Sequence, residues 1–232
     1  MKLRLFSLLI ALSVLLSLAS CSGERYDGLY AVDDEGGLTF TVRGSDTRPK
    51  QISVKRGDTL LFTTKVKIPK KLGRLGGDYG FSAVDLNFDG HTDFMIANAV
   101  SGDCISYLCW LYNAEAQTYE PSAELSGLCN IKADASLKAL FAFTHTYTAE
   151  KAYLDVPASH VTVDSTTKYV WENGKLTPEI RATVTYYSET DLYCYSLAKY
   201  DGESQAFADP DDKWLTPEEY KAFDMSFLYY FK

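Results

Sequence analysis

The chain has 232 residues, enough for one large domain or two small ones with a hydrophobic core, and we expect one domain. It carries 31 acidic and 23 basic residues, and the resulting formal net charge of −8 makes nucleic acid a poor candidate for a partner. An acidic surface of this kind keeps a protein soluble, and by itself it identifies no ligand.

The first 21 residues have the pattern of a bacterial lipoprotein signal. Lys2 and Arg4 precede an apolar stretch over residues 5–18, which is too short for a comfortable membrane span. The stretch ends in a lipobox, Leu18-Ala19-Ser20-Cys21. Cleavage before Cys21 would leave a lipidated N-terminus. The alternative is an ordinary signal peptide with an incidental cysteine at its end.

A lipid on Cys21 would hold the protein in the cell envelope, on the periplasmic face of the outer membrane or the outer face of the cytoplasmic membrane. Ser22 is not Asp, a pattern that favours the outer membrane in a two-membrane bacterium. Removal of residues 1–20 takes away two basic residues and no acidic ones, so the remaining 212 residues have a formal charge of −10. We therefore divide the chain into a signal peptide (1–20), a lipidated tether (21–37) and one β domain (38–232).

Residues 38–232 alternate between short runs rich in Thr, Val, Tyr and Phe and clusters of turn residues, which predicts strands joined by turns. The predicted strands are Leu38–Val42, Gln51–Lys55, Thr59–Ile68, Gly80–Asp85, Phe94–Ala99, Ile105–Tyr112, Ala139–Tyr147, His160–Trp171, Lys175–Tyr187 and Leu192–Lys199. Because hardly any helix separates them, we expect a mainly β, antiparallel single domain, propeller-like or sandwich-like. The absence of a repeat of fixed period weakens a regular propeller.

The loop that carries most chemistry is Asp85-Leu86-Asn87-Phe88-Asp89-Gly90-His91-Thr92-Asp93. Oxygen-bearing side chains stand at its positions 1, 3, 5 and 9, and glycine stands at position 6. Calcium takes six to eight oxygen ligands, and such a loop brings alternate side chains around the ion. The carbonyl of His91 would add a ligand at position 7. Clustered carboxylates repel one another without a cation, which also favours a bound ion.

Two related loop types do not fit this segment. An EF-hand needs a bidentate Glu at position 12, where this chain has Ile96 within a predicted strand. A dockerin-type loop also requires an acid there and a second copy of the motif. The sequence therefore predicts a structural calcium site between two strands. The alternative is an Asx-rich turn that needs no metal.

Four cysteines remain once Cys21 is lipidated, and an extracytoplasmic location permits disulfides. They are Cys104, Cys109, Cys129 and Cys194, and their spacing selects none of the three complete pairings. In a continuous strand Cys104 and Cys109 would point to opposite faces, so we expect Cys109 to pair elsewhere. A zinc site is disfavoured because there is no C-x-x-C and the three histidines have no ligand spacing.

Asn173-Gly174 is the strongest hairpin signal, because both residue types tolerate the positive φ of a type I′ turn. Thr216-Pro217-Glu218-Glu219 combines an N-cap, a proline at the first helical position and the Glu of a capping box, so it predicts a short C-terminal helix to about Phe223. A weaker pattern suggests a helix at Ala133–Lys138. No nucleophile elbow, H-E-x-x-H or P-loop occurs, and we expect a protein that is not an enzyme and has no catalytic residues.

Three segments carry a resemblance to a known family: Val84–Phe94, Leu108–Asn113 and Tyr169–Leu176. Over about residues 78–180 the chain resembles bacterial periplasmic lipoproteins that have a propeller-like β fold and one calcium loop similar to FG-GAP-type loops. A characterised member is an immunity protein that inhibits a lysozyme-like peptidoglycan hydrolase delivered by rival bacteria.

The resemblance implies calcium ligands at Asp85, Asn87, Asp89, His91 (through its carbonyl) and Asp93. It also implies a protein partner of the peptidoglycan hydrolase type, and it identifies no inhibitory residues. We expect a calcium-stabilised, membrane-anchored monomer that binds such a partner. The alternative is a carbohydrate-binding or structural surface lipoprotein, suggested by 17 Tyr and 3 Trp.

Overall fold

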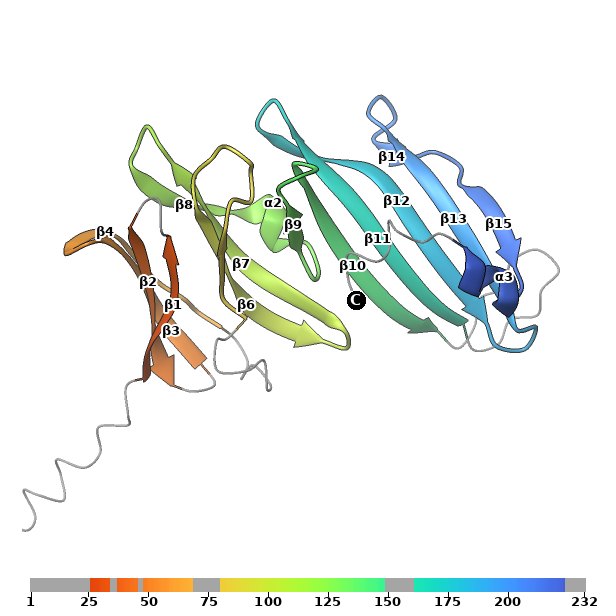
Figure 1. Cartoon of the computed structure of the whole chain (residues 1–232), viewed down its shortest axis with the longest axis horizontal. Helices are drawn as coiled ribbons and strands as arrows, with labels where there is room; N and C mark the ends of the chain where they lie inside the picture. The colour runs from red at the N-terminus through yellow and green to blue at the C-terminus, as the bar shows by residue number, and fades with distance from the viewer. Residues whose placement is uncertain (1–25, 34–36, 46–47, 69–79, 149–160, 224–232) are drawn as a thin grey trace, which may run out of the picture. The chain divides into compact units, whose positions relative to one another are not determined.

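The computed structural model describes residues 26–33, 37–45, 48–68, 80–148 and 161–223 (Figure 1). The chain forms two compact units, residues 1–79 and residues 80–232. The sequence predicts a different division, into a signal peptide, a tether and one domain over residues 38–232. The signal peptide and the lipidation site Cys21 lie outside the described residues.

The N-terminal unit contains a four-stranded antiparallel sheet in the order β1-β2-β3-β4. Its strands are β1 (Tyr26–Asp33), β2 (Leu38–Ser45), β3 (Arg48–Arg56) and β4 (Thr59–Lys65). Alternate residues of β2 and β3 are buried, as expected for strands with one face on a core: Leu38, Phe40, Val42, Ile52 and Val54. β1 lies within residues 21–37, the predicted tether, so described strand structure begins before Leu38.

The C-terminal unit begins with a second four-stranded antiparallel sheet in the order β5-β6-β7-β8. These strands are β5 (Ser82–Val84), β6 (Asp93–Ser101), β7 (Cys104–Asn113) and β8 (Thr118–Ser122). Asp93 to Ala97 of β6 are all buried, so both faces of this strand are covered. On one face Phe94 stacks on Trp110 and contacts Tyr119, with ring centroids 4.9 and 5.0 Å apart.

The larger sheet of this unit has seven strands in the order β14-β13-β12-β11-β10-β9, with β15 also paired to β13 (Figure 1). The strands are β9 (Lys132–Asp134), β10 (Ala139–Thr148), β11 (Val161–Glu172), β12 (Lys175–Tyr187), β13 (Leu192–Asp201), β14 (Ala206–Phe207) and β15 (Asp211–Leu215). Two short helices, α2 (Ala123–Ser126) and α3 (Pro217–Ala222), complete the unit.

The two sheets of the C-terminal unit share a hydrophobic core. Met95 and Cys109 from the smaller sheet, Leu125 from α2, and Leu140 and Leu176 from the larger sheet belong to one buried cluster. Leu86, from the loop between β5 and β6, belongs to the same cluster and is fully buried. The loop is thus attached to the core through its second residue.

The fold class expected from the sequence, mainly antiparallel β with a short C-terminal helix, is confirmed. All ten predicted strands occur, while β1, β8, β9, β14 and β15 were not predicted. The prediction of a helix at Ala133–Lys138 is wrong, because this segment ends strand β9 and continues as a turn. In that turn Asp134 Oδ1 accepts the N–H groups of Ser136 and Leu137. Helix α2 forms earlier instead, where Ser122 caps its first turn. Within the described ranges, no helix has the length and apolar character to cross a membrane.

Candidate metal-binding loop between β5 and β6

The predicted calcium loop connects two adjacent antiparallel strands. β5 ends at Val84 and β6 begins at Asp93, the last of the predicted ligands. Phe88 and Gly90 have φ angles of 59° and 88°, so the chain reverses through left-handed backbone at both residues. Glycine adopts this conformation without steric cost, which explains position 6 of the motif.

The side chains of the loop point back onto its own backbone. The carboxylate of Asp85 accepts the N–H of Asp89 at 3.2 Å and that of Gly90 at 2.8 Å. Asp89 Oδ1 accepts the N–H of His91 at 2.8 Å, and Asn87 Oδ1 accepts the N–H of Asp89 at 3.2 Å. The amide of Asn87 also donates to Asp89 Oδ2 at 2.9 Å. These bonds bring Asp85, Asn87 and Asp89 together around one turn.

Asp93 lies deeper than the other three and is fully buried. Its Oδ2 accepts the N–H of Leu86 at 2.7 Å, and its Oδ1 accepts the N–H of Tyr112 on β7 at 2.7 Å. Burial raises the pKa of this carboxyl to about 7, against the lowering effect of the two hydrogen bonds. Asp89 and Asp85 raise the pKa further, so the three carboxyl groups are close enough to repel one another.

Aromatic side chains from other strands hold the loop in place. The indole Nε1–H of Trp171, on β11, donates to the carbonyl of Leu86 at 2.8 Å. The hydroxyl of Tyr119, on β8, donates to the carbonyl of Thr92 at 3.0 Å, and the ring of His91 lies 5.1 Å from that of Tyr112. These supports could not be predicted, because nothing in the sequence places residues 119 and 171 beside residues 86 and 92.

The donors of the loop suit a hard cation, since Asp85, Asn87, Asp89, Asp93 and the His91 carbonyl all offer oxygen. Each carboxylate oxygen that accepts one N–H keeps a second lone pair for a ligand bond. Within the described part of the chain, however, no three His, Cys, Asp or Glu side chains converge closely enough to hold a metal ion. The same contacts also suit a turn closed by its own hydrogen bonds, so the geometry accommodates both interpretations of the motif.

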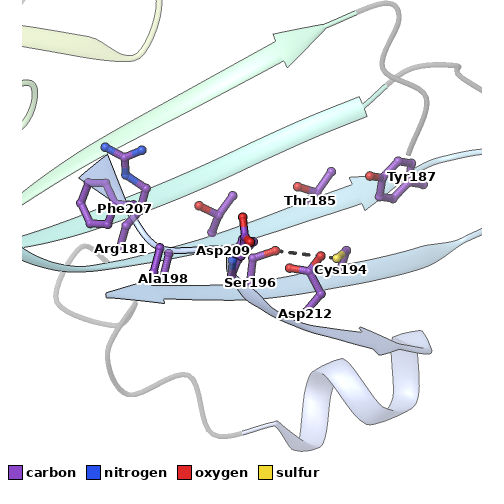
Figure 2. Close-up of a pocket in the computed structure, with 12 residues that line it drawn as sticks. Arg181, Thr185, Tyr187, Cys194, Ser196, Ala198, Phe207, Asp209 and Asp212 are labelled. Atoms are coloured by element: carbon purple, nitrogen blue, oxygen red, sulfur yellow. Dashed lines mark hydrogen bonds between the residues drawn. The ribbon is translucent and has the colours of Figure 1, made fainter. Parts of the chain in front are cut away.

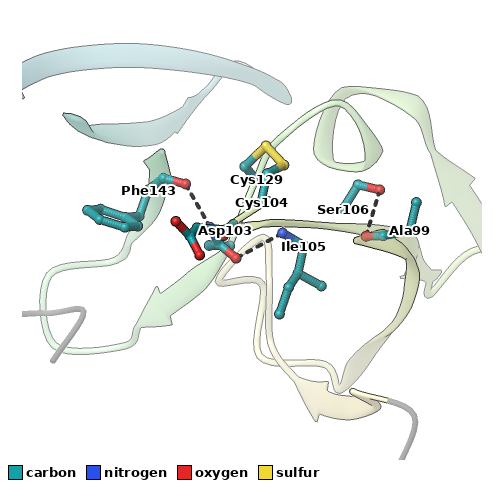
Figure 3. Close-up of a disulfide and its surroundings, with 8 residues drawn as sticks. Ala99, Asp103, Cys104, Ile105, Ser106, Cys129 and Phe143 are labelled. Carbon is teal, nitrogen blue, oxygen red and sulfur yellow. Dashed lines mark hydrogen bonds between the residues drawn. A yellow bond between two sulfur atoms is a disulfide. The ribbon is translucent and has the colours of Figure 1, made fainter. Parts of the chain in front are cut away.

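One disulfide joins Cys104, at the start of β7, to Cys129 (Figure 3). Beside it, Asn130 links β7 to β10 by accepting the N–H of Ile105 and donating to the carbonyl of Phe143. Cys109 and Cys194 are buried and form no disulfide among the described residues, so the disulfide expected at Cys109 does not occur. Burial raises the pKa of the Cys109 thiol to about 12, which keeps it protonated.

A second group of titratable side chains lies near this disulfide. His145 Nδ1, on β10, is 2.5 Å from Asp164 Oδ1 on β11, and its Nε2 is 3.8 Å from Asp103 Oδ2. The hydrogen bond to Asp164 raises the pKa of His145 above 6.5. Asp103 precedes the first residue of β7, so this histidine of the larger sheet lies near the β6–β7 turn of the smaller sheet.

No protein-family model matches the chain, and no curated protein sequence matches it. Among solved structures, the chain is similar to one described as a Xanthomonas type IV secretion system related protein. The TM-score is 0.49 at 12% sequence identity, over 80% of this chain and 99% of that chain. A similarity of this degree assigns the chain to no family, and the resemblance to calcium-binding lipoproteins stays a prediction.

Proposed function

We propose that this protein is a calcium-stabilised lipoprotein of the cell envelope that binds a protein partner and acts without catalysis. The partner class we favour is a lysozyme-like peptidoglycan hydrolase, which the protein would inhibit. The observation that carries the calcium part of the proposal is the loop at residues 85–93, which carries five oxygen donors on a turn fastened to a buried core.

Membrane anchoring rests on the lipobox that ends at Cys21. The Cys104–Cys129 disulfide supports an extracytoplasmic location, because such bonds persist in oxidising compartments. Replacement of Cys21 by Ser tests the anchor: wild-type protein should sediment with the membranes of the expressing cells, and the variant should not. Equal sedimentation of both proteins would contradict lipid anchoring.

Calcium would be held by Asp85, Asn87, Asp89, Asp93 and the carbonyl of His91. A bound divalent cation would neutralise the carboxylates that now repel one another. The two ends of the loop need no ion to hold them, since Trp171 and Tyr119 donate hydrogen bonds to backbone carbonyls there. The role of the ion is therefore to stabilise the connection between β5 and β6.

The test of this site is thermal unfolding of the full chain in detergent, in EDTA and across a calcium titration, with magnesium as the control. Extracellular sites bind calcium at about 10⁻⁴ to 10⁻³ M, so several millimolar should stabilise the protein by roughly 1–2 kcal/mol. A variant with Asp85→Ala and Asp89→Ala should lose this gain. Asp134→Ala is the matched control, because Asp134 closes a turn by the same kind of hydrogen bond outside the loop.

A calcium-independent loss of stability in the double variant would mean that Asp85 and Asp89 serve only the turn. The partner is tested separately, by adding the purified protein to cell-wall clearing assays with lysozymes of several classes. Inhibition of one class would support the inhibitor function. Uniform failure would favour a surface lipoprotein without inhibitory activity.

A further inference from the structure

A polar pocket of about 340 Å³ lies on the larger sheet of the C-terminal unit, far in sequence from the calcium loop (Figure 2). Its floor comes from one face of β12 and β13, and its wall comes from residues 207–212, which run from the end of β14 into the start of β15. The lining residues are Arg181, Thr183, Thr185, Tyr187, Cys194, Ser196, Ala198, Phe207, Ala208, Asp209, Pro210 and Asp212. The volume is at the lower end of the range of ligand pockets, about 300–1,000 Å³.

The floor continues a row of hydroxyl groups that crosses the sheet. Thr144, Ser165, Thr183 and Ser196 are directly opposite one another on β10, β11, β12 and β13, and Asp212 on β15 ends the row. Directly paired residues share one face of a sheet, so these groups lie side by side. The hydroxyls of Ser165 and Thr183 are 3.2 Å apart, within hydrogen-bonding distance. The row therefore leads through hydrogen-bonding groups to a carboxylate.

Side chains that contact their neighbours bound the two ends of the pocket. At one end the guanidinium of Arg181 lies 4.0 Å from the centre of the Phe207 ring, and its Nε donates to Thr167 Oγ1 at 3.3 Å. At the other end the buried ring of Tyr187 packs on Trp214, with centroids 5.3 Å apart. Thr185, between these ends, is only 6% exposed. The polar groups are thus positioned before any ligand arrives, which lowers the entropy lost on binding.

We propose that this pocket binds a saccharide of one or two rings. Sugar hydroxyls both donate and accept hydrogen bonds, and the pocket offers both kinds of group. The carboxylates of Asp209 and Asp212 accept, Arg181 donates, and the floor hydroxyls do either. An anionic ligand would meet two carboxylates on the wall, and an apolar ligand would leave the floor hydroxyls without partners. A neutral ligand rich in hydroxyl groups would therefore form hydrogen bonds with more of the lining groups than an anionic or an apolar ligand would.

The site lies in the C-terminal unit but shares none of the loop residues Asp85 to Asp93, so this proposal is independent of the calcium and hydrolase proposals. Its failure would leave both of those tests unchanged. It adds a second recognition surface to a protein placed in the cell envelope, where polysaccharide is abundant.

The experiment is ligand-observed NMR with the full chain, purified in a polyoxyethylene detergent because sugar-headed detergents would compete. The probes are glucose, galactose, N-acetylglucosamine and the disaccharides cellobiose and chitobiose, each titrated to about 50 mM, which would saturate a site with a dissociation constant of about 1 mM. Glycine and lysine are included as zwitterionic probes. We expect saturable binding of at least one sugar and none of either amino acid.

Asp211 and Asp212 provide a matched pair of variants. Asp212 pairs with Ser196 and faces the pocket, whereas Asp211 pairs with Leu197 and therefore lies on the other face of β15. Asp212→Asn should weaken the sugar about tenfold, the loss expected when a hydrogen bond to a charged group is removed. Asp211→Asn should leave affinity unchanged. Ser196→Ala, a smaller change on the floor, should weaken it in a protein that still folds, as checked by its melting temperature.

Three results would overturn the proposal. The first is no saturable binding of any sugar by a folded wild-type protein. The second is equal affinity in the Asp211→Asn and Asp212→Asn variants, which would place binding elsewhere. The third is binding of the amino acids in preference to the sugars, which would mean that Arg181 and the carboxylates recognise a zwitterion.

Discussion

Replacement of Asp93 by Asn should raise the stability of the calcium-free protein relative to the wild type as the pH rises toward 7.5, although it removes a fully buried carboxylate that accepts two backbone hydrogen bonds. The reason is that burial raises the pKa of Asp93 from its ordinary value of 3.8 to about 7. Between about pH 4 and pH 7 the folded protein keeps a proton on this group that the unfolded chain has already lost. Stability therefore falls as pH rises through this interval.

The size of the effect follows from the distance between the two pKa values. Each unit of difference corresponds to about 1.36 kcal/mol, so a raise of about three units costs the wild type roughly 4 kcal/mol between pH 4 and pH 7. Asn resembles the protonated Asp in shape and does not titrate, but its NH2 group donates where one oxygen of Asp93 accepts an N–H. That lost hydrogen bond costs the variant about 1–3 kcal/mol at every pH. The pH-dependent part is separate: the variant should gain a few kcal/mol on the wild type between pH 4.5 and pH 7.5.

The assay is urea unfolding of both proteins at several pH values in the absence of calcium, compared as a difference so that all other titrating groups cancel. Added calcium should cancel this gain at pH 7.5, because the cation favours the ionised carboxylate that only the wild type has. Stabilities that run parallel from pH 4.5 to 7.5 would refute the reasoning. They would mean that the hydrogen bonds from Leu86 and Tyr112 fully offset the burial of the charge.

Three further predictions concern groups around the loop and the disulfide. Trp171→Phe removes the N–H donor to the carbonyl of Leu86, so urea unfolding should show a free energy of unfolding lower by about 1 kcal/mol or more. An unchanged unfolding midpoint would mean that water replaces the indole as the donor. Replacing Cys104 and Cys129 together by Ser opens a loop of 25 residues, and by the chain-entropy relation it should lower the free energy of unfolding by about 3.5 kcal/mol relative to wild type measured under the same conditions. A loss below about 1 kcal/mol would contradict that relation. NMR titration should find the pKa of His145 above 6.5 in wild type and lower in Asp164→Asn, so this pair stabilises the folded protein below pH 6.5 and ceases to do so as pH rises through the folded pKa. Equal pKa values in the two proteins would mean that Asp164 does not hold the proton on the imidazole.

Local signals in the sequence predicted local structure well. Asn173 and Gly174 have φ angles of 52° and 75° at the β11–β12 hairpin, as their residue types indicate. Thr216 and Glu219 form the predicted capping box at the start of α3. Both patterns act within four residues, so each element follows from the residues that form it.

Longer-range features were not predictable in the same way. β14 and β15 are short, contain Ala, Asp and Lys, and become strands by pairing with β13 rather than by their own propensity. The Cys104–Cys129 disulfide depends on an isolated antiparallel bridge between Cys129 and Ser106 of β7. The spacing of the cysteines in the sequence does not predict this bridge. The pocket likewise depends on the register of β10 to β15, because only the assembled sheet places the hydroxyl groups in one row.

The bond between Trp171 and Leu86 joins residues 85 positions apart, and this separation bears on the order of events in folding. Contacts between distant residues carry a large loop-closure cost and tend to form late, after neighbouring strands have paired. The calcium loop would then reach its final shape only once β11 has joined the larger sheet. An ion that recognises that shape would slow unfolding while leaving the folding rate almost unchanged. If calcium binds as we propose, it would thus lengthen the lifetime of the folded protein without hastening its formation.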